Sequence, residues 1–178
     1  MRVLLLYSTI DGHTRDICAR LKEMIDSAGH RGVLAELSDK SEINVGEFDG
    51  VILGASIRYG RHRPAVARFI DRHTGFLESR PCAFFSVNAV ARKPEKQSRE
   101  TNPYVRKFLR SISWRPGHIG IFGGLIDYPR YGFIDRNMIR LIMWITKGPT
   151  DPAGTYDFTN WDDVETFGEK YLQMLQSA

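Results

Sequence analysis

Short apolar runs alternate with amphipathic segments along most of this chain. The runs have the length and composition of strands buried on both faces of a sheet, and they span residues 2–7, 33–37, 51–55, 82–87 and 119–122. Apolar residues recur at helical spacing in residues 14–28, in a segment that Pro64 opens, and in residues 161–175. Repeated strand–helix units favour an α/β fold in which a five-stranded parallel sheet carries helices on both faces.

A loop of small and hydroxyl-bearing residues follows the first apolar run and leads into the first predicted helix. Its candidate ligand-binding members are Ser8, Thr9, Asp11, Gly12, His13 and Thr14. Free N–H groups at a helix start, the helix dipole and hydroxyl side chains together suit a phosphate group. The spacing is neither that of the dinucleotide-binding glycine turn nor that of the lysine-containing triphosphate loop. It therefore favours a phosphate monoester, with an ordinary Asp-Gly turn as the alternative.

A phosphate loop after the first strand favours the strand order 2-1-3-4-5, whose switch point lies between the first and third strands. A flat ligand bound there needs walls from the loops that follow the third and fourth strands. These loops contain Ser56, Ile57, Arg58, Tyr59 and Gly60, and then Ser86, Val87, Asn88 and Ala89. The ring of Tyr59 is placed either to stack on the ligand or to cover an edge of the core. Three suitable loops at successive carboxyl ends indicate flavin mononucleotide (FMN), a cofactor that brings its own redox chemistry.

Length and composition fit one globular domain over residues 1–178, because 178 residues with 42% hydrophobic content can bury a sizeable core. Cys18 and Cys82 have no metal-ligand spacing and are expected to be buried reduced thiols, so no metal is expected. A strand that begins at Arg2 leaves no room for a signal peptide, and no apolar run approaches the length of a membrane span. We therefore expect a cytoplasmic protein.

The net charge of +4 is distributed unevenly along the chain. Basic residues predominate between residues 56 and 147, whereas both ends are acidic, and this segregation indicates an anionic partner. The densest part is a predicted basic insertion near residues 88–118, where lysine and arginine can pair with carboxylates. A solvated basic loop is the alternative. No nucleic-acid-binding motif accompanies the charge, so nucleic acid is not expected as a partner.

A second predicted insertion, near residues 126–150, contains an amphipathic helix over residues 134–147. Its apolar positions are Ile134, Met138, Ile139, Leu141, Ile142, Met143, Trp144 and Ile145. The remaining positions include Asp135, Arg136, Arg140 and Lys147. A wide apolar face with an indole and basic flanks suits a membrane interface or an apolar wall for a quinone, and it equally suits packing on the domain itself. Periodicity identifies the face without identifying what covers it.

Several motifs beyond the phosphate loop carry a family resemblance. They are Gly-Ala-Ser-Ile-Arg-Tyr-Gly at 54–60, Ser-Val-Asn at 86–88, Ala-Arg-Lys-Pro-Glu-Lys at 91–96, Trp-Arg-Pro at 114–116 and Tyr-Pro-Arg-Tyr at 128–131. With the loop at 8–14, the chain resembles flavodoxin-like proteins and, among them, the flavodoxin-type protoporphyrinogen IX oxidases of bacteria. The resemblance extends from the first strand to the final helix, and the 91–96 motif is far more specific than the phosphate loop.

The resemblance implies a non-covalent FMN and the oxidation of protoporphyrinogen IX to protoporphyrin IX in haem biosynthesis. It also implies a membrane quinone as acceptor, menaquinone or ubiquinone, and peripheral association with the anionic inner face of the cell membrane. Arg92, Lys93, Lys96 and Arg130 are expected to bind the substrate carboxylates. No side chain is a convincing acid or base, so no catalytic residue is assigned. Two alternatives stay open: a flavin-dependent NAD(P)H:quinone oxidoreductase, and a non-enzymatic flavodoxin-type electron carrier.

Overall fold

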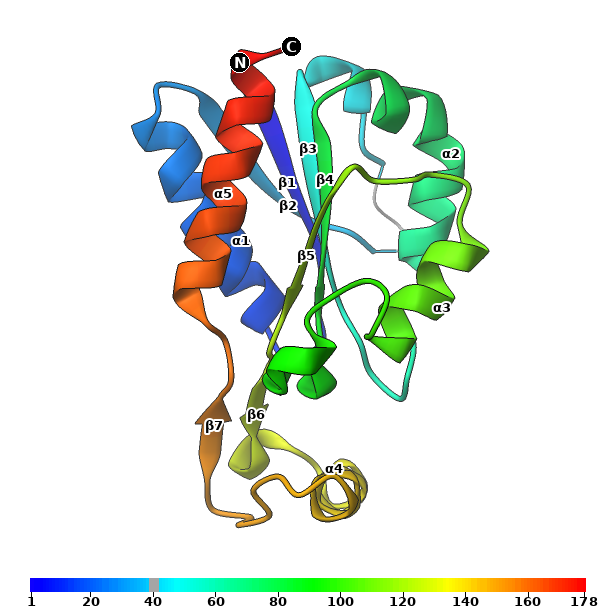
Figure 1. Ribbon diagram of the computed structural model, residues 1–178, viewed down its shortest axis with the longest axis vertical. Coiled ribbons are helices and arrows are strands. Elements are labelled where there is room, and N and C mark those ends of the chain that lie inside the picture. Colours follow the sequence, from blue (N-terminus) through cyan, green and yellow to red (C-terminus); the bar gives the residue numbers. More distant parts are fainter. Residues whose placement is uncertain (39–41) are drawn as a thin grey trace.

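The computed structural model describes residues 1–38 and 42–178. Five strands form its main sheet: β1 (Arg2–Ser8), β2 (Arg31–Glu36), β3 (Gly50–Ser56), β4 (Cys82–Val87) and β5 (His118–Phe122). Their order is β2-β1-β3-β4-β5 and every neighbouring pair is parallel (Figure 1). The predicted strand order is therefore confirmed, and the switch point lies between β1 and β3 as expected.

Helices cover both faces of this sheet. One face carries α1 (His13–Ser27) and α5 (Trp161–Gln176), and the other carries α2 (Pro64–Ser79) and α3 (Pro103–Ser111) (Figure 1). Successive strand side chains point to opposite faces, so Leu5 packs in one core cluster with Leu21 of α1, and Leu4 packs in another with Ile70 of α2. This two-sided burial explains why the strands read as continuous apolar runs.

An α-helix and a small second sheet are absent from the sequence-based prediction. The first is α3, a nine-residue helix inside the predicted basic insertion, which Asn102 caps by accepting a hydrogen bond from the N–H of Val105. The second is a two-stranded antiparallel sheet of β6 (Leu125–Asp127) and β7 (Thr155–Asp157). Strands this short contain too few residues to show a two-residue period.

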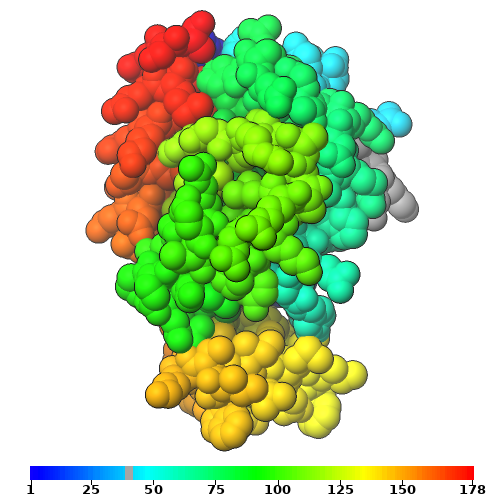
Figure 2. Space-filling view, turned by 45° about the vertical axis from the view of Figure 1, so that its right-hand side comes forward, coloured from blue at the N-terminus to red at the C-terminus, as the bar shows by residue number. Residues whose placement is uncertain are grey.

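The chain between β6 and β7 contains the helix α4 (Phe133–Ile145), which lies beyond the carboxyl ends of the main sheet (Figure 1). In the space-filling view, residues around α4 form a yellow and orange cap at one end of the molecule (Figure 2). Short 3-10 helices complete the fold at Val45–Glu47, Ala89–Arg92, Pro94–Lys96 and Tyr128–Arg130. No helix within the two described ranges has the length and apolarity needed to cross a membrane.

Candidate functional site

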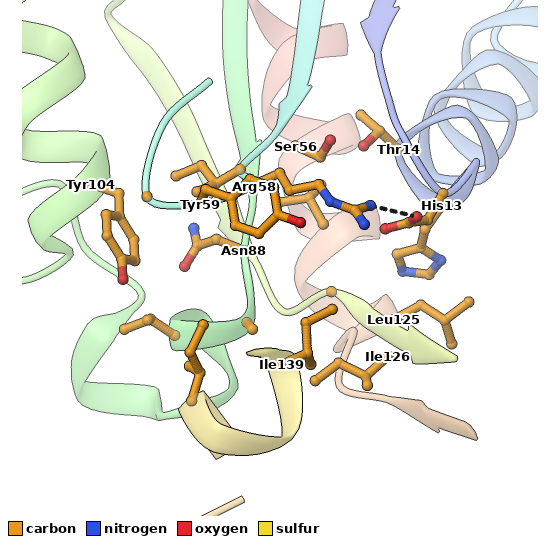
Figure 3. A pocket seen from close by; sticks show the side chains of 18 of the residues that line it. His13, Thr14, Ser56, Arg58, Tyr59, Asn88, Tyr104, Leu125, Ile126 and Ile139 are labelled. Carbon is orange, nitrogen blue, oxygen red and sulfur yellow. Dashed lines mark hydrogen bonds and ion pairs between the residues drawn. The ribbon is translucent and has the colours of Figure 1, made fainter. Parts of the chain in front are cut away.

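A cavity of about 350 Å³ lies at the carboxyl ends of the parallel strands, between the sheet and α4 (Figure 3). Three loops predicted from the sequence converge on it, after β1, β3 and β4. Of the predicted cofactor-binding residues, those that line it are Thr9, Asp11, His13, Thr14, Ser56, Ile57, Arg58, Tyr59, Gly60, Val87, Asn88 and Ala89. The loops that the sequence singles out separately thus lie around one cavity.

The remaining three predicted residues, Ser8, Gly12 and Ser86, lie outside the cavity lining. Ser8 and Ser86 are buried at the ends of their strands. Gly12 is the N-cap of α1 with φ of 89°, a left-handed conformation that favours glycine, and its N–H donates to Oγ1 of Thr9 at 3.0 Å. Among the described residues nothing lies within 4 Å of a Cβ built on Gly12, so a substitution there is opposed by backbone strain rather than by crowding.

Two hydroxyl groups at this loop test whether it suits a phosphate. Within the part of the chain that the structure describes, Oγ of Ser8 and Oγ1 of Thr14 are buried and have no hydrogen-bond partner. Buried hydroxyls are normally satisfied, and an orphaned one costs about 1–3 kcal/mol. The first N–H groups of α1 also lack partners within the helix. Unsatisfied donors of both kinds at a helix N-terminus fit the phosphate of a bound ligand.

Arg58 links three segments at the edge of the cavity. Its Nη1 donates to Oδ1 of Asp11 at 3.1 Å, and its Nη2 donates to Asp135 of α4. The hydroxyl of Tyr59 donates to the same Asp135 carboxylate, and the Arg58 guanidinium lies 5.8 Å from the ring centroid of Tyr131. Asp11 therefore braces the loop after β1 through Arg58, whereas Gly12 is the N-cap of α1. The same cluster holds α4 against the loop after β3.

Several cavity residues were not predicted as ligand contacts. They are Val90, Tyr104, Gly124, Leu125, Ile126, Tyr131, Ile139, Ile142 and Met143. Tyr131 belongs to the motif at 128–131. The α4 residues belong to the apolar face, for which an apolar wall for a quinone is one of the interpretations given above. Val90 belongs to the 3-10 helix that follows β4, next to the predicted loop at 86–89. The others come from α3 and from the segment around β6, which carry no recognisable signal in the sequence.

The apolar residues of α4 divide between two environments, which corrects the single stripe that periodicity indicated. Met143 is buried in a cluster with Ile126 and Tyr128, and Ile139 packs against it. On the other side the side chains are exposed: Phe133, Ile134, Met138, Leu141, Trp144 and Ile145. Ile142 lines the cavity and is also 41% exposed, so it lies at the boundary. The helix therefore packs on its own domain and presents an apolar face to the outside.

The four predicted substrate-binding residues lie outside the cavity lining in the described part of the chain. Arg92 donates to the carbonyl oxygen of Ala89 at 2.9 Å and to the carbonyl and hydroxyl oxygens of Thr146 at 2.7 and 2.8 Å, so it joins the loop after β4 to the end of α4. Burial lowers the pKa of Arg92. Nε of Arg130 lies 3.9 Å from Oδ2 of Asp127. Lys93 and Lys96 are half-buried, and the role of all four toward substrate stays a prediction.

A buried polar network supports the cavity wall after β4. Nε2 of His62 lies 3.0 Å from Oγ of Ser86, and Oδ1 of Asn88 accepts from the N–H of Ala91 and from Nδ2 of Asn102, both at 3.1 Å. Burial lowers the pKa of His62 to about 3, so this ring stays neutral at physiological pH. The network therefore orients Asn88 rather than carrying protons to the cavity.

The strand order, the helix-start loop and the cavity at the switch point together define a flavodoxin-like α/β protein. A family model described as "Flavodoxin domain" matches residues 4–153. Oxidised flavodoxin 1 of Bacillus cereus superposes with a TM-score of 0.56 at 14% identity, covering 100% of this chain and 99% of that one. A flavodoxin from the domain Archaea superposes with a TM-score of 0.54 at 13% identity, covering 99% and 98%. These solved structures establish the fold.

Curated relatives are more similar in sequence. A protein of Escherichia coli strain K12 named protoporphyrinogen IX dehydrogenase (quinone) is 41% identical over 174 residues, which cover 98% of this chain and 96% of that protein. A protein of Leishmania major with the same name is 39% identical over 97% of this chain and 75% of its own length. The chain therefore belongs to the flavodoxin-domain family and, within it, to the family of these dehydrogenases. A flavodoxin domain indicates a flavin cofactor.

Proposed function

We propose that this chain is an FMN-dependent enzyme that oxidises protoporphyrinogen IX to protoporphyrin IX and passes the electrons to a membrane quinone. The observation that carries the proposal is the 41% identity with a relative of that name over 98% of the chain. That length includes every segment that lines the cavity. The removal of six hydrogens from the porphyrinogen corresponds to three rounds of two-electron oxidation.

The phosphate site favours FMN over other flavins. Toward the residues that the structure describes, the buried hydroxyls of Ser8 and Thr14 have no partners, and the start of α1 adds N–H groups, so the site suits a compact phosphate monoester. Riboflavin has no phosphate, and a dinucleotide would place a diester there. The loops at 56–60 and 86–89 would contact the ring system. When bound, the flavin supplies the redox chemistry, accepting two electrons at a time and passing them to the acceptor.

The chain's own residues bind and orient the reactants. The Arg58–Asp135–Tyr59 cluster holds α4 over the cavity, and Ile139, Ile142 and Met143 give the cavity an apolar wall. Such a wall suits an apolar quinone and a flat macrocycle, and it excludes water from the reacting atoms. The basic residues Lys93 and Lys96 are close in sequence to the cavity loop at 86–90 and offer cations for the carboxylates of the porphyrinogen.

The exposed face of α4 supports peripheral binding to the inner face of the cell membrane. Phe133, Ile134 and Trp144 are 81%, 74% and 72% exposed, which is unusual for such large apolar side chains gathered on one short helix. Lys147 is exposed at the end of the same helix, while Arg136 and Arg140 donate to carbonyl oxygens of flanking loops and add positive charge. Apolar area with basic flanks is the combination that interfacial helices use on anionic lipid.

Steady-state assays with the purified, FMN-loaded protein test the proposal. We expect turnover with protoporphyrinogen IX and a quinone, and none with NAD(P)H and the same quinone. Turnover with NAD(P)H in place of the porphyrinogen would identify an NAD(P)H:quinone oxidoreductase. A bound flavin that can be reduced and reoxidised, in a protein that turns over neither donor, would identify an electron carrier. A protein that takes up no flavin would refute all three, and an absorption spectrum decides this point first.

A further inference from the structure

His13 occupies the first position of α1, where it lines the cavity together with Thr14 (Figure 3). Its Nε2 lies 2.5 Å from Oγ1 of Thr159 and 3.6 Å from Oδ1 of Asp157, and its ring meets the edge of the Trp161 ring with centroids 6.1 Å apart. The end of β7, the segment after it and the start of α5 thus contact the ring, which also lines the cavity.

The hydrogen bonds around Thr159 determine which nitrogen of His13 carries the proton. The hydroxyl of Thr159 donates to the carbonyl oxygen of Gly123 at 3.0 Å, so its only proton is already used. Nε2 of His13 must therefore be the donor to Thr159, and the neutral ring is the Nε2–H tautomer. In that tautomer Nδ1 is unprotonated, and among the described residues it has no hydrogen-bond partner. It is free to accept a proton.

Burial and the charges around the ring determine the pH at which Nδ1 of His13 accepts this proton. Burial lowers the pKa of His13, and the carboxylates of Asp157 on β7 and Asp16 on α1 oppose this effect without overcoming it. The other charged groups at the edge of the cavity, Asp11, Asp135 and Arg58, form one cluster in which Arg58 is ion-paired with both carboxylates. Without a ligand, the ring is therefore neutral at pH 7. A phosphate dianion at the start of α1 would add a nearby negative charge that favours the imidazolium form.

We propose that His13 takes up one proton from solvent when FMN binds, and that its Nδ1–H then donates a charge-assisted hydrogen bond to the phosphate. The inference rests on the proposed FMN cofactor and adds a specificity-determining residue to its site. A phosphate cradle of neutral donors would bind the dianion equally well across neutral pH. A ring that becomes charged makes the affinity for FMN rise as the pH falls, because the imidazolium forms more readily at lower pH. The affinity for riboflavin, which has no phosphate, stays unaffected.

Titration calorimetry of the flavin-free protein tests this with FMN and riboflavin, in two buffers of different ionisation enthalpy. The matched variant is His13→Gln, whose side-chain amide can still donate to Thr159 but cannot become charged. We expect the wild type to take up more protons per FMN bound at pH 7 than the variant, which corrects for the proton on the phosphate itself. With riboflavin the two proteins should show equal uptake and equal affinity.

The pH dependence gives a second measurement. The variant should bind FMN about tenfold more weakly than the wild type near pH 6, as expected for the loss of one charge-assisted hydrogen bond. The difference should shrink as the pH rises and disappear once the phosphate-bound imidazolium has lost its proton. In the wild type alone, the NMR signal of the His13 Cε1–H should move to the imidazolium position when FMN is added at pH 7, a readout that does not depend on the variant folding.

Equal proton uptake by wild type and variant with FMN would overturn the role of His13 while leaving the FMN site intact. So would a His13 signal that stays at the neutral position. Absence of FMN binding at every pH would overturn the cofactor proposal and this inference together, so the two failures are distinguishable.

Discussion

Replacing Ile134 and Trp144 with glutamate should detach the protein from anionic membranes. These side chains are 74% and 72% exposed, and both lie outside the cavity lining. Full burial of a large apolar side chain is worth about 1.5–3 kcal/mol, so moving most of both into the lipid interface contributes roughly 3 kcal/mol. Each new carboxylate near an anionic surface costs about 1 kcal/mol. Together these terms should lower the membrane partition coefficient by about a thousandfold or more.

Co-sedimentation with vesicles of mixed neutral and anionic lipid measures this effect. The variant pair avoids Ile142, which lines the cavity, so bound flavin should be unchanged and its absorbance reports a folded protein. A matched control, Gln173→Glu with Gln176→Glu, adds the same charge on α5 at the opposite end of the molecule from α4 (Figure 1) and should bind as the wild type does. A yellow Ile134→Glu, Trp144→Glu protein that still sediments would refute α4 as the membrane anchor.

Three further changes probe other parts of the site. Gly12→Val should abolish FMN binding, because a β-branched residue is strained at φ of 89° beside the anion; full flavin content after purification would show that the loop is misassigned. Lys93→Glu with Lys96→Glu should raise the KM for porphyrinogen severalfold at low salt and less at high salt, with flavin content unchanged. An unchanged KM at low salt would make this segment a solvated loop. Asp135→Asn should weaken the contacts of Arg58 and Tyr59 with α4 and so speed flavin release in stopped-flow dilution, whereas an unchanged rate would show that this cluster does not retain the cofactor.

The main sheet and its order were predictable from the sequence because each strand is a local apolar run and the crossovers after β1 and β3 are local amphipathic helices, α1 and α2. The helix that Pro64 opens and the final helix were located for the same reason, since proline at a first turn and helical spacing are local signals. The loop after the first strand is an equally local pattern. Its position predicts a cavity at the switch point, and the cavity lies there.

The remaining features depend on contacts between segments far apart in the chain. Nothing near Asp135 in the sequence identifies Arg58 as its partner. Thr159 contacts His13 although 146 positions separate them in the sequence. The pairing of β6 with β7 has the same origin.

Burial was likewise decided only in three dimensions. Periodicity located the apolar residues of α4, but the position of the helix over the cavity determined that Met143 is covered and Trp144 is exposed. The hydroxyls of Ser8 and Thr14 lack partners among the residues that the structure describes because of how distant segments pack around them, which no local pattern encodes. The sequence by itself determined the sheet and the loop that leads from its first strand into α1, because local patterns encode them. The tertiary structure decided which side chains meet, because that depends on packing between distant segments.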